Sequence, residues 1–257
     1  METKDMLVNN NNFKTINELF NLVSNFHIIS GPCSVESFEQ MEKTAQLLVE
    51  NDLKFIRGGA YKPRTSPYDF QGLGLEGLKI LDCIKKRYGL IVVSEILDPR
   101  DVETALNYID IIQIGSRNMH NFALLKEVGK TEHPILLKRG MMATIKEFLN
   151  AAEYIVSNGN KNLILCERGI RTFEDSTRNT LDISCIALVK QETSLPIIAD
   201  LSHSLGRTDI IIPILKAVKA LGVDGIMLEL HDNPKEALSD GFQQIKFDEF
   251  KNILKSF

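Results

Sequence analysis

The feature that most constrains the fold of this chain is an alternation of short apolar runs with longer amphipathic stretches, which continues from residue 27 to the end. The apolar runs are often β-branched, as in the buried strands of a parallel sheet. They lie at residues 27–30, 54–56, 90–94, 111–114, 135–137, 163–165, 197–199 and 225–228. Eight strand–helix pairs at this spacing predict an α/β fold, a (β/α)8 barrel. A doubly wound parallel sheet is the alternative, because one sequence does not show whether a sheet closes.

The stretches between the runs carry apolar residues at helical spacing and recognisable helix start signals. Residues 37–51 and 73–88 both predict amphipathic helices. Asp98 followed by Pro99 is typical of an N-cap and a first helical position. Pro213 falls inside residues 209–221, so we expect that helix to begin near the proline. Residues 1–26 predict a polar N-terminal extension, helical in part over 16–23, before a single barrel domain at 27–257.

Composition argues against several classes of function. The net charge of −4 and the pI of about 5.8 disfavour general nucleic-acid binding. There is no run of 18 apolar residues, so no membrane span is expected, and the N-terminus lacks a signal-peptide pattern. The four cysteines are widely spaced, without a CxxC pair, as in the reduced thiols of a cytoplasmic protein. We therefore expect a cytoplasmic protein that acts on small molecules.

Polar and charged residues follow every apolar run. Because active sites of α/β barrels lie at the C-terminal ends of the strands, these residues predict one polar, basic mouth for an anionic small molecule. The largest motif, RGGAYKPRTSPYDF at 57–70, combines Arg57, Lys62 and Arg64 with glycines, prolines and hydroxyl residues. The planar fork of arginine and the point charge of lysine both suit phosphate groups.

A candidate metal set lies at the same strand ends: Cys33, His203 and Glu229 follow runs one, seven and eight, and Asp240 lies in the loop beyond. These three runs are neighbours in a closed barrel. A thiolate, an imidazole and two carboxylates suit a divalent ion such as Mn²⁺, Fe²⁺, Zn²⁺ or Co²⁺. No local spacing rule supports the set, so Cys33 as a small buried apolar residue stays open. His231 is a rival ligand or a partner of one.

Seven motifs, in order along the chain, resemble those of 3-deoxy-D-arabino-heptulosonate 7-phosphate (DAHP) synthases. They read GPCSVES (31–37), RGGAYKPRTSPYDFQG (57–72), IGSRNM (114–119), LLKRG (136–140), ERGIRTF (167–173), DLSHSLGR (200–207) and ELHDNPKEALSDG (229–241). The chain is similar to the compact type I branch of that family, which is related to 3-deoxy-D-manno-octulosonate 8-phosphate (KDO8P) synthase. The match spans residues 27 to 245 approximately.

The resemblance implies that phosphoenolpyruvate, erythrose 4-phosphate and water give DAHP and phosphate, the first step of the shikimate pathway to the aromatic amino acids. It implies that Cys33, His203, Glu229 and Asp240 hold the metal, and that Lys62, Cys33 and His203 are catalytic, with Lys62 as a proton donor. The residues implied to bind substrate are Arg57, Lys62, Arg64, Thr65, Ser66, Ser116, Arg117, Lys138, Arg168, His203 and Asp240.

Some roles follow less directly from the resemblance. Glu95 or Asp200 is expected to handle the proton of the water. Arg64, Thr65 and Ser66 are expected to grip erythrose 4-phosphate, in part across a subunit interface. A homo-oligomer, either a dimer or a tetramer, is therefore expected.

Three other functions stay open on the residues. KDO8P synthase, which uses arabinose 5-phosphate, typically reads KANRSS where this chain reads KPRTS at 62–66. A non-catalytic binding barrel would have lost a member of the metal set, yet all four are present. A Schiff-base aldolase built on Lys138 would not need that set. The segments flanking the barrel are too short for a sensor domain, so we expect no direct feedback by tyrosine or phenylalanine.

Overall fold

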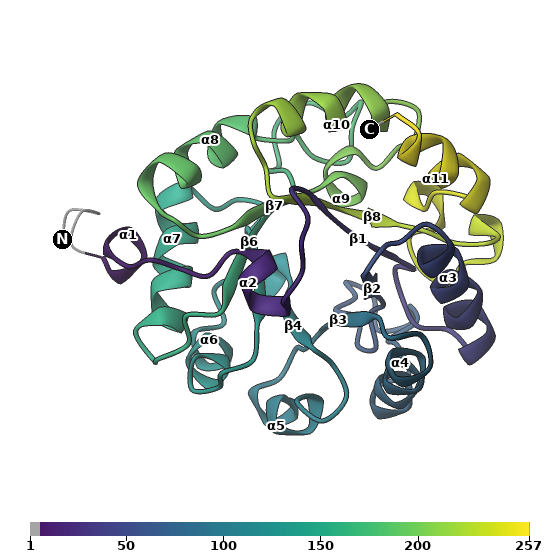
Figure 1. Cartoon of the computed structure of the whole chain (residues 1–257), viewed down its shortest axis with the longest axis horizontal. Coiled ribbons are helices and arrows are strands. Elements are labelled where there is room, and N and C mark those ends of the chain that lie inside the picture. The colour runs from purple at the N-terminus through teal and green to yellow at the C-terminus, as the bar shows by residue number, and fades with distance from the viewer. Residues whose placement is uncertain (1–5, 257) are drawn as a thin grey trace.

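The computed structural model describes residues 6–256, and its eight parallel strands form a closed barrel in sequence order (Figure 1). β1 pairs with β8, with His27 opposite Gly225, and this pairing closes the sheet. The strands are β1 (His27–Gly31), β2 (Phe55–Arg57), β3 (Ile91–Glu95), β4 (Ile111–Ile114), β5 (Ile135–Lys138), β6 (Leu163–Glu167), β7 (Ile197–Asp200) and β8 (Gly225–Glu229). The predicted (β/α)8 TIM barrel is confirmed, and the doubly wound sheet is excluded.

Helices surround the barrel, and those for which the sequence carries start signals begin within two residues of the expected positions. They are α3 (Phe38–Glu50), α4 (Leu75–Tyr88), α5 (Val102–Ala105), α6 (Phe122–Gly129), α7 (Ile145–Val156), α8 (Ile183–Glu192), α9 (Leu201–Leu205), α10 (Ile211–Ala220) and α11 (Phe247–Leu254). The Ser37 side chain caps α3 by accepting from the Gln40 N–H. Asp98 caps the short 3₁₀ helix η2 (Pro99–Asp101), which leads into α5. Pro213 is the third residue of α10, where a missing N–H costs nothing.

The period of two along each strand decides which residues reach the site. Inside the barrel, alternate positions such as Phe55, Val93 and Leu136 form an apolar layer. The residue two positions further along each strand faces the same way but lies at the C-terminal end. These positions are occupied by Arg57, Glu95 and Lys138. The barrel interior is therefore apolar in its middle and charged at its C-terminal mouth, where the strand-end motifs gather.

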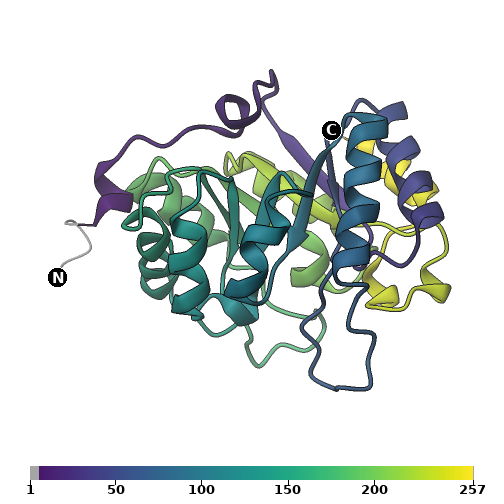
Figure 2. The same cartoon turned by 90° about the horizontal axis from the view of Figure 1, so that it is seen from below.

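The second half of the N-terminal extension packs against the opposite end of the barrel, and the first helix of the extension lies against α7. The extension contains α1 (Leu7–Asn10) and α2 (Ile16–Phe20), whereas residues 1–5 and 257 lie outside the described residues. Ile16 joins the interior apolar layer, and the Phe20 ring meets the Phe55 ring edge to face at 5.4 Å. Figure 2 shows this purple segment at one end of the barrel and the long blue loop after β2 at the other. Within residues 6–256 no helix is long and apolar enough to cross a membrane.

Replacing Ile16 with alanine should lower the free energy of unfolding by about 2 kcal/mol, because its side chain is buried in the layer that closes the barrel bottom. Urea unfolding followed by circular dichroism measures this change. Lys14→Ala, an exposed residue just before α2, is the matched control and should leave the unfolding midpoint unchanged. Equal midpoints for Ile16→Ala and the unmodified chain would show that α2 does not contribute to the core.

Candidate active site

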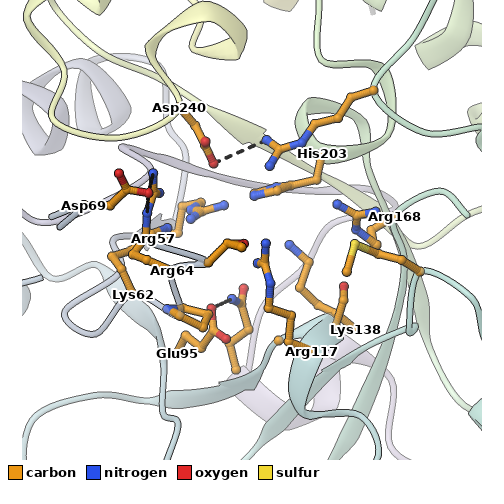
Figure 3. A pocket seen from close by; sticks show the side chains of 17 residues that line it. Arg57, Lys62, Arg64, Asp69, Glu95, Arg117, Lys138, Arg168, His203 and Asp240 are labelled. Atoms are coloured by element: carbon orange, nitrogen blue, oxygen red, sulfur yellow. Dashed lines mark hydrogen bonds and ion pairs between the residues drawn. The ribbon is translucent and has the colours of Figure 1, made fainter. Parts of the chain in front are cut away.

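A cavity of about 250 Å³ opens at the C-terminal ends of the strands (Figure 3). Arginine and lysine supply seven of its side chains, against three carboxylates. The lining residues are Arg57, Lys62, Pro63, Arg64, Thr65, Asp69, Glu95, Gln113, Gly115, Ser116, Arg117, Lys138, Met141, Arg168, Arg178, His203 and Asp240. Figure 3 shows Arg117, Lys138 and Arg168 directed toward one shared space. An excess of cations in a concave site favours a ligand with several negative charges.

Ten of the eleven residues predicted to bind substrate line this cavity, and Ser66 does not. Its hydroxyl accepts a hydrogen bond from the Tyr68 N–H at 3.2 Å and so belongs to a local turn of the loop after β2. Arg64 lines the cavity while its guanidinium lies 3.4 Å from Asp69 in the same loop. The predicted role of Ser66 in binding stays a prediction, because only its position in this chain is described.

Three members of the predicted metal set lie together. One ligand atom each from Cys33, Glu229 and Asp240 falls within 4.8 Å of the other two. Cys33 Sγ is 3.5 Å from Asp240 Oδ2. His203 is not in that close group, but its Nε2 is 3.5 Å from Glu229 Oε1. The rival His231 instead lies beside Glu36, so the geometry favours His203 as the nitrogen ligand.

The state of these side chains fits a divalent ion. Glu229 Oε1 is buried and accepts no hydrogen bond, although the Arg57 guanidinium lies 3.1 Å away as an ion-pair partner. Burial lowers the pKa of His203 to about 4, which leaves the imidazole neutral, as a ligand must be. Burial, and then the charge of Glu229, raises the pKa of the Cys33 thiol to about 12. A divalent ion would displace the thiol proton and balance the carboxylate charges. These residues therefore form a candidate metal site.

Asp200 connects this metal site to the cationic side of the cavity. Its Oδ2 accepts from His203 Nδ1 at 2.8 Å and also pairs with the Lys138 ammonium group. Its Oδ1 accepts a hydrogen bond from the backbone N–H of His203 at 2.9 Å. Asp200 thereby caps the N-terminus of α9, which follows β7 directly. Burial opposes ionisation of Asp200, but His203 and Lys138 outweigh it and hold its pKa well below the usual value. Because Nδ1 donates to a carboxylate, Nε2 is the atom that faces Glu229.

Replacing Asp200 with asparagine should weaken Mn²⁺ binding by about 10-fold to 100-fold, because a neutral amide no longer fixes the His203 tautomer. Electron paramagnetic resonance of free Mn²⁺ during a titration measures the affinity. Asp209→Asn, an exposed carboxylate that pairs with Arg207, is the control and should bind Mn²⁺ as the unmodified chain does. Unchanged affinity in Asp200→Asn would remove the orienting role.

Sequence reasoning missed Gln113 and Met141, which line the cavity, and it also missed Arg178 and Gln243. Arg178 lies in the loop between β6 and α8 and lines the cavity. Gln243 lies in the 3₁₀ helix η5 (Gly241–Gln243) and donates from Nε2 to Glu229 Oε2 at 2.5 Å. Neither follows an apolar run directly, so the strand-end rule does not reach them. Arg178 lies a few residues after the motif at 167–173, and Gln243 lies shortly after the motif at 229–241. Such proximity in sequence does not predict which contacts a side chain makes.

A closed parallel barrel with a basic cavity beside a candidate metal site defines a class of enzyme that acts on phosphorylated or carboxylated small molecules. Comparison with known proteins specifies the family. A family model described as the DAHP synthetase I family matches residues 23–257. The chain therefore belongs to this family, as its motifs predicted.

The relatives with the higher sequence identity are DAHP synthases, and the relative of lower identity is of the KDO8P type. A phospho-2-dehydro-3-deoxyheptonate aldolase of Thermotoga maritima is 54% identical over 230 residues, covering 90% of this chain and 68% of that protein. A crystal structure of the T. maritima DAHP synthase matches with a TM-score of 0.87 and 53% identity, over 90% of this chain and 67% of that one. A 2-dehydro-3-deoxyphosphooctonate aldolase of Syntrophotalea carbinolica is 30% identical over 246 residues, covering 89% of this chain and 88% of that protein.

Proposed function

We propose that this chain condenses phosphoenolpyruvate with erythrose 4-phosphate and water to give DAHP and phosphate. The observation that carries the proposal is the 54% identity to an enzyme of this type, against 30% for an enzyme of the KDO8P type. The cavity supports it, since two phosphates and a carboxylate held side by side need several cations.

The chain would bind phosphoenolpyruvate through Arg117, Lys138 and Arg168, whose side chains line the same cavity. Arg57 approaches from β2, with one guanidinium nitrogen 3.1 Å from Glu229 Oε1 and another donating to the Cys33 carbonyl oxygen at 3.2 Å. Its charge is therefore shared between the substrate side and the candidate metal site. Holding the enol carbon next to the aldehyde is the main task of these groups, because the two anionic substrates repel each other.

A divalent ion held by Cys33, His203, Glu229 and Asp240 would supply Lewis-acid polarisation of the aldehyde oxygen of erythrose 4-phosphate. Among the proposed ions are Mn²⁺, Fe²⁺, Zn²⁺ and Co²⁺, since the mixed sulfur, nitrogen and oxygen set suits each of them. Lys62 lies beside this set, with Nζ 3.0 Å from Cys33 Sγ and 3.1 Å from the Cys33 carbonyl oxygen. From there its ammonium group would donate a proton to the alkoxide that forms when the enol carbon attacks.

Glu95 is the proposed acceptor of the proton from water. Its Oε1 is buried without a hydrogen-bond partner, and burial raises the pKa of Glu95 against the opposing charges of Lys62 and Lys138. A raised pKa improves a carboxylate as a base. Asp200 is already engaged by His203 and Lys138, which favours Glu95 between the two predicted candidates. Water would add to the former enol carbon, and the hemiketal would lose phosphate by C–O cleavage.

We also propose an oligomeric state, a domain organisation and a cellular location for this chain. A homo-oligomer, dimer or tetramer, would bring Arg64 and its loop toward a neighbouring cavity. Support comes from the exposure of that loop, where the Tyr68 side chain is 97% exposed. Residues 27–257 would form one catalytic barrel domain and residues 1–26 its extension. The protein would act in the cytoplasm, as its reduced cysteines suggest.

The test is phosphate release from phosphoenolpyruvate by chelator-stripped protein, with and without Mn²⁺, offered erythrose 4-phosphate or arabinose 5-phosphate. We expect turnover that depends on Mn²⁺ and on erythrose 4-phosphate. A preference for arabinose 5-phosphate would transfer the chain to the KDO8P reaction. Undiminished turnover without metal would make Cys33 structural, and no turnover with either sugar would support a non-catalytic barrel.

A further inference from the structure

Arg178 lines the cavity and contacts a member of the candidate metal set. Its Nη1 is 3.3 Å from Asp240 Oδ2, an ion pair marked by the dashed line at Asp240 in Figure 3. Asp240 Oδ2 is also the atom that lies 3.5 Å from Cys33 Sγ. The guanidinium therefore contacts the carboxylate oxygen that faces the thiol, and it does so from the cavity side.

The same guanidinium reaches a second carboxylate through Gln243. Nη1 of Arg178 also donates to the Gln243 side-chain oxygen. Gln243, which is 1% exposed, donates in turn from Nε2 to Glu229 Oε2 at 2.5 Å. This bond occupies Oε2 of Glu229, whereas the buried Oε1 lies 3.1 Å from the Arg57 guanidinium and 3.5 Å from His203 Nε2. Arg178 is thus linked directly or through one residue to two carboxylates of the metal set.

Asp240 needs such support because its backbone is not held by a helix or strand. It precedes η5 and adopts a left-handed conformation, with φ of +46°, which a residue with a Cβ rarely adopts. Arg178 is itself anchored, since its N–H donates to the Leu205 carbonyl at 2.9 Å. A Cβ at Gly206 would come within 2.5 Å of the Arg178 Cβ, so the two loops pack closely. The guanidinium also lies 5.7 Å from the Phe242 ring centre.

We propose that Arg178 is a positioning residue for the metal site, which orients Asp240 directly and Glu229 through Gln243. This inference rests on the proposed function only in requiring that a divalent ion binds there. Carboxylates that ligate a metal depend on the hydrogen bonds made by their other lone pairs, and losing such a partner weakens metal binding. A direct contact between Arg178 and a substrate phosphate is the competing role, because its side chain is 28% exposed and lines the same cavity.

The test is a Co²⁺ titration of the chelator-stripped full chain, read from the thiolate-to-cobalt absorption that Cys33 would produce. Arg178→Ala should raise the Co²⁺ dissociation constant by about 10-fold to 100-fold. Gln243→Met should change it in the same direction by less, because Arg178 would still hold Asp240. Arg178→Lys should recover only part of the affinity, since an ammonium lacks the planar fork that serves two acceptors. Arg207→Ala, which removes an exposed arginine–carboxylate pair outside the cavity lining, is the matched control.

A second titration, with phosphoenolpyruvate and metal-free protein, separates the two roles of Arg178. A positioning residue predicts unchanged phosphoenolpyruvate affinity in Arg178→Ala. If phosphoenolpyruvate affinity falls while Co²⁺ affinity holds, Arg178 is a substrate ligand and the inference is wrong. If the unmodified chain binds Co²⁺ and Arg178→Ala binds it equally well, the inference also fails while the metal site stands. If Cys33→Ala and the unmodified chain give the same Co²⁺ response, the metal site itself is wrong and the inference falls with it.

Discussion

Replacing Cys33 with alanine should lower kcat/KM in the presence of Mn²⁺ by about 10³-fold or more, because the loss of Lewis-acid polarisation removes several kcal/mol of transition-state stabilisation. The thiol is fully buried, and its sulfur lies within reach of Asp240 and Lys62. Alanine leaves the backbone contacts of Cys33 in place, including the N–H bond to Gln244 Oε1 at 3.1 Å. The barrel should therefore fold, and the variant should lose metal affinity and activity together.

The measurement is a steady-state assay of phosphate release, paired with a Mn²⁺ titration of the same preparation. Cys83→Ala is the matched control, since Cys83 is an exposed cysteine on α4 far from the strand ends in sequence. His203→Ala should also lower both Mn²⁺ affinity and activity, because it removes the proposed nitrogen ligand of the metal. Full activity in Cys33→Ala with normal Mn²⁺ dependence would contradict the assignment of the thiol and leave Cys33 as a buried apolar residue.

Replacing Lys138 with alanine should reduce kcat/KM by about 10²-fold to 10⁴-fold, because one cation that offsets developing charge is lost from the inner cavity. It should also destabilise the fold. Lys138 and Asp200 form an ion pair whose side chains are 4% and 0% exposed, and removing one partner of a buried pair costs about 3–5 kcal/mol. His203 still donates to Asp200, so we expect the lower end of that range.

The assay should vary phosphoenolpyruvate and erythrose 4-phosphate separately, with urea unfolding measured on the same samples. We expect the phosphoenolpyruvate KM to rise more than the erythrose 4-phosphate KM. Lys216→Ala, an exposed lysine on α10, is the control for a simple loss of charge. Borohydride with substrate should not trap Lys138, whereas a trapped adduct would establish the Schiff-base alternative. An unchanged kcat/KM would discard the role of Lys138.

The strand ends show how far the chain alone predicts this site. Each predicted apolar run became a strand, and the observed strand ends differ from the predicted ones by no more than two residues. Because side chains alternate along a strand, a charged residue two positions after an interior apolar residue must face the mouth. That local rule is enough to place Arg57, Glu95 and Lys138. Closure of the barrel then brings Cys33 and Glu229 together, since β1 pairs with β8.

Sequence reasoning placed the loop residues less well than the strand residues, because loops lack the alternation of side chains that strands have. Ser66 was grouped with Arg64 and Thr65 by motif, but its hydroxyl turns to the Tyr68 N–H in its own loop. Arg178 and Gln243 were not predicted at all, although they connect the metal set to the cavity. Loop side chains have no fixed period, so their direction follows from contacts between segments that are distant in the sequence.

By its order of apolar runs and strand-end motifs, the sequence predicted the barrel, its basic mouth and its family, and it named the members of the candidate metal set. The strands and the mouth follow from the periodicity of secondary structure, which acts over a few residues, whereas the family and the metal set follow from the resemblance of the motifs. Only the tertiary structure decided that Asp200 couples His203 to Lys138, that His203 rather than His231 faces Glu229, and that Arg178 reaches Asp240. The physical reason is that hydrogen-bond partners, burial and pKa shifts depend on distances across the closed barrel, which no local pattern contains.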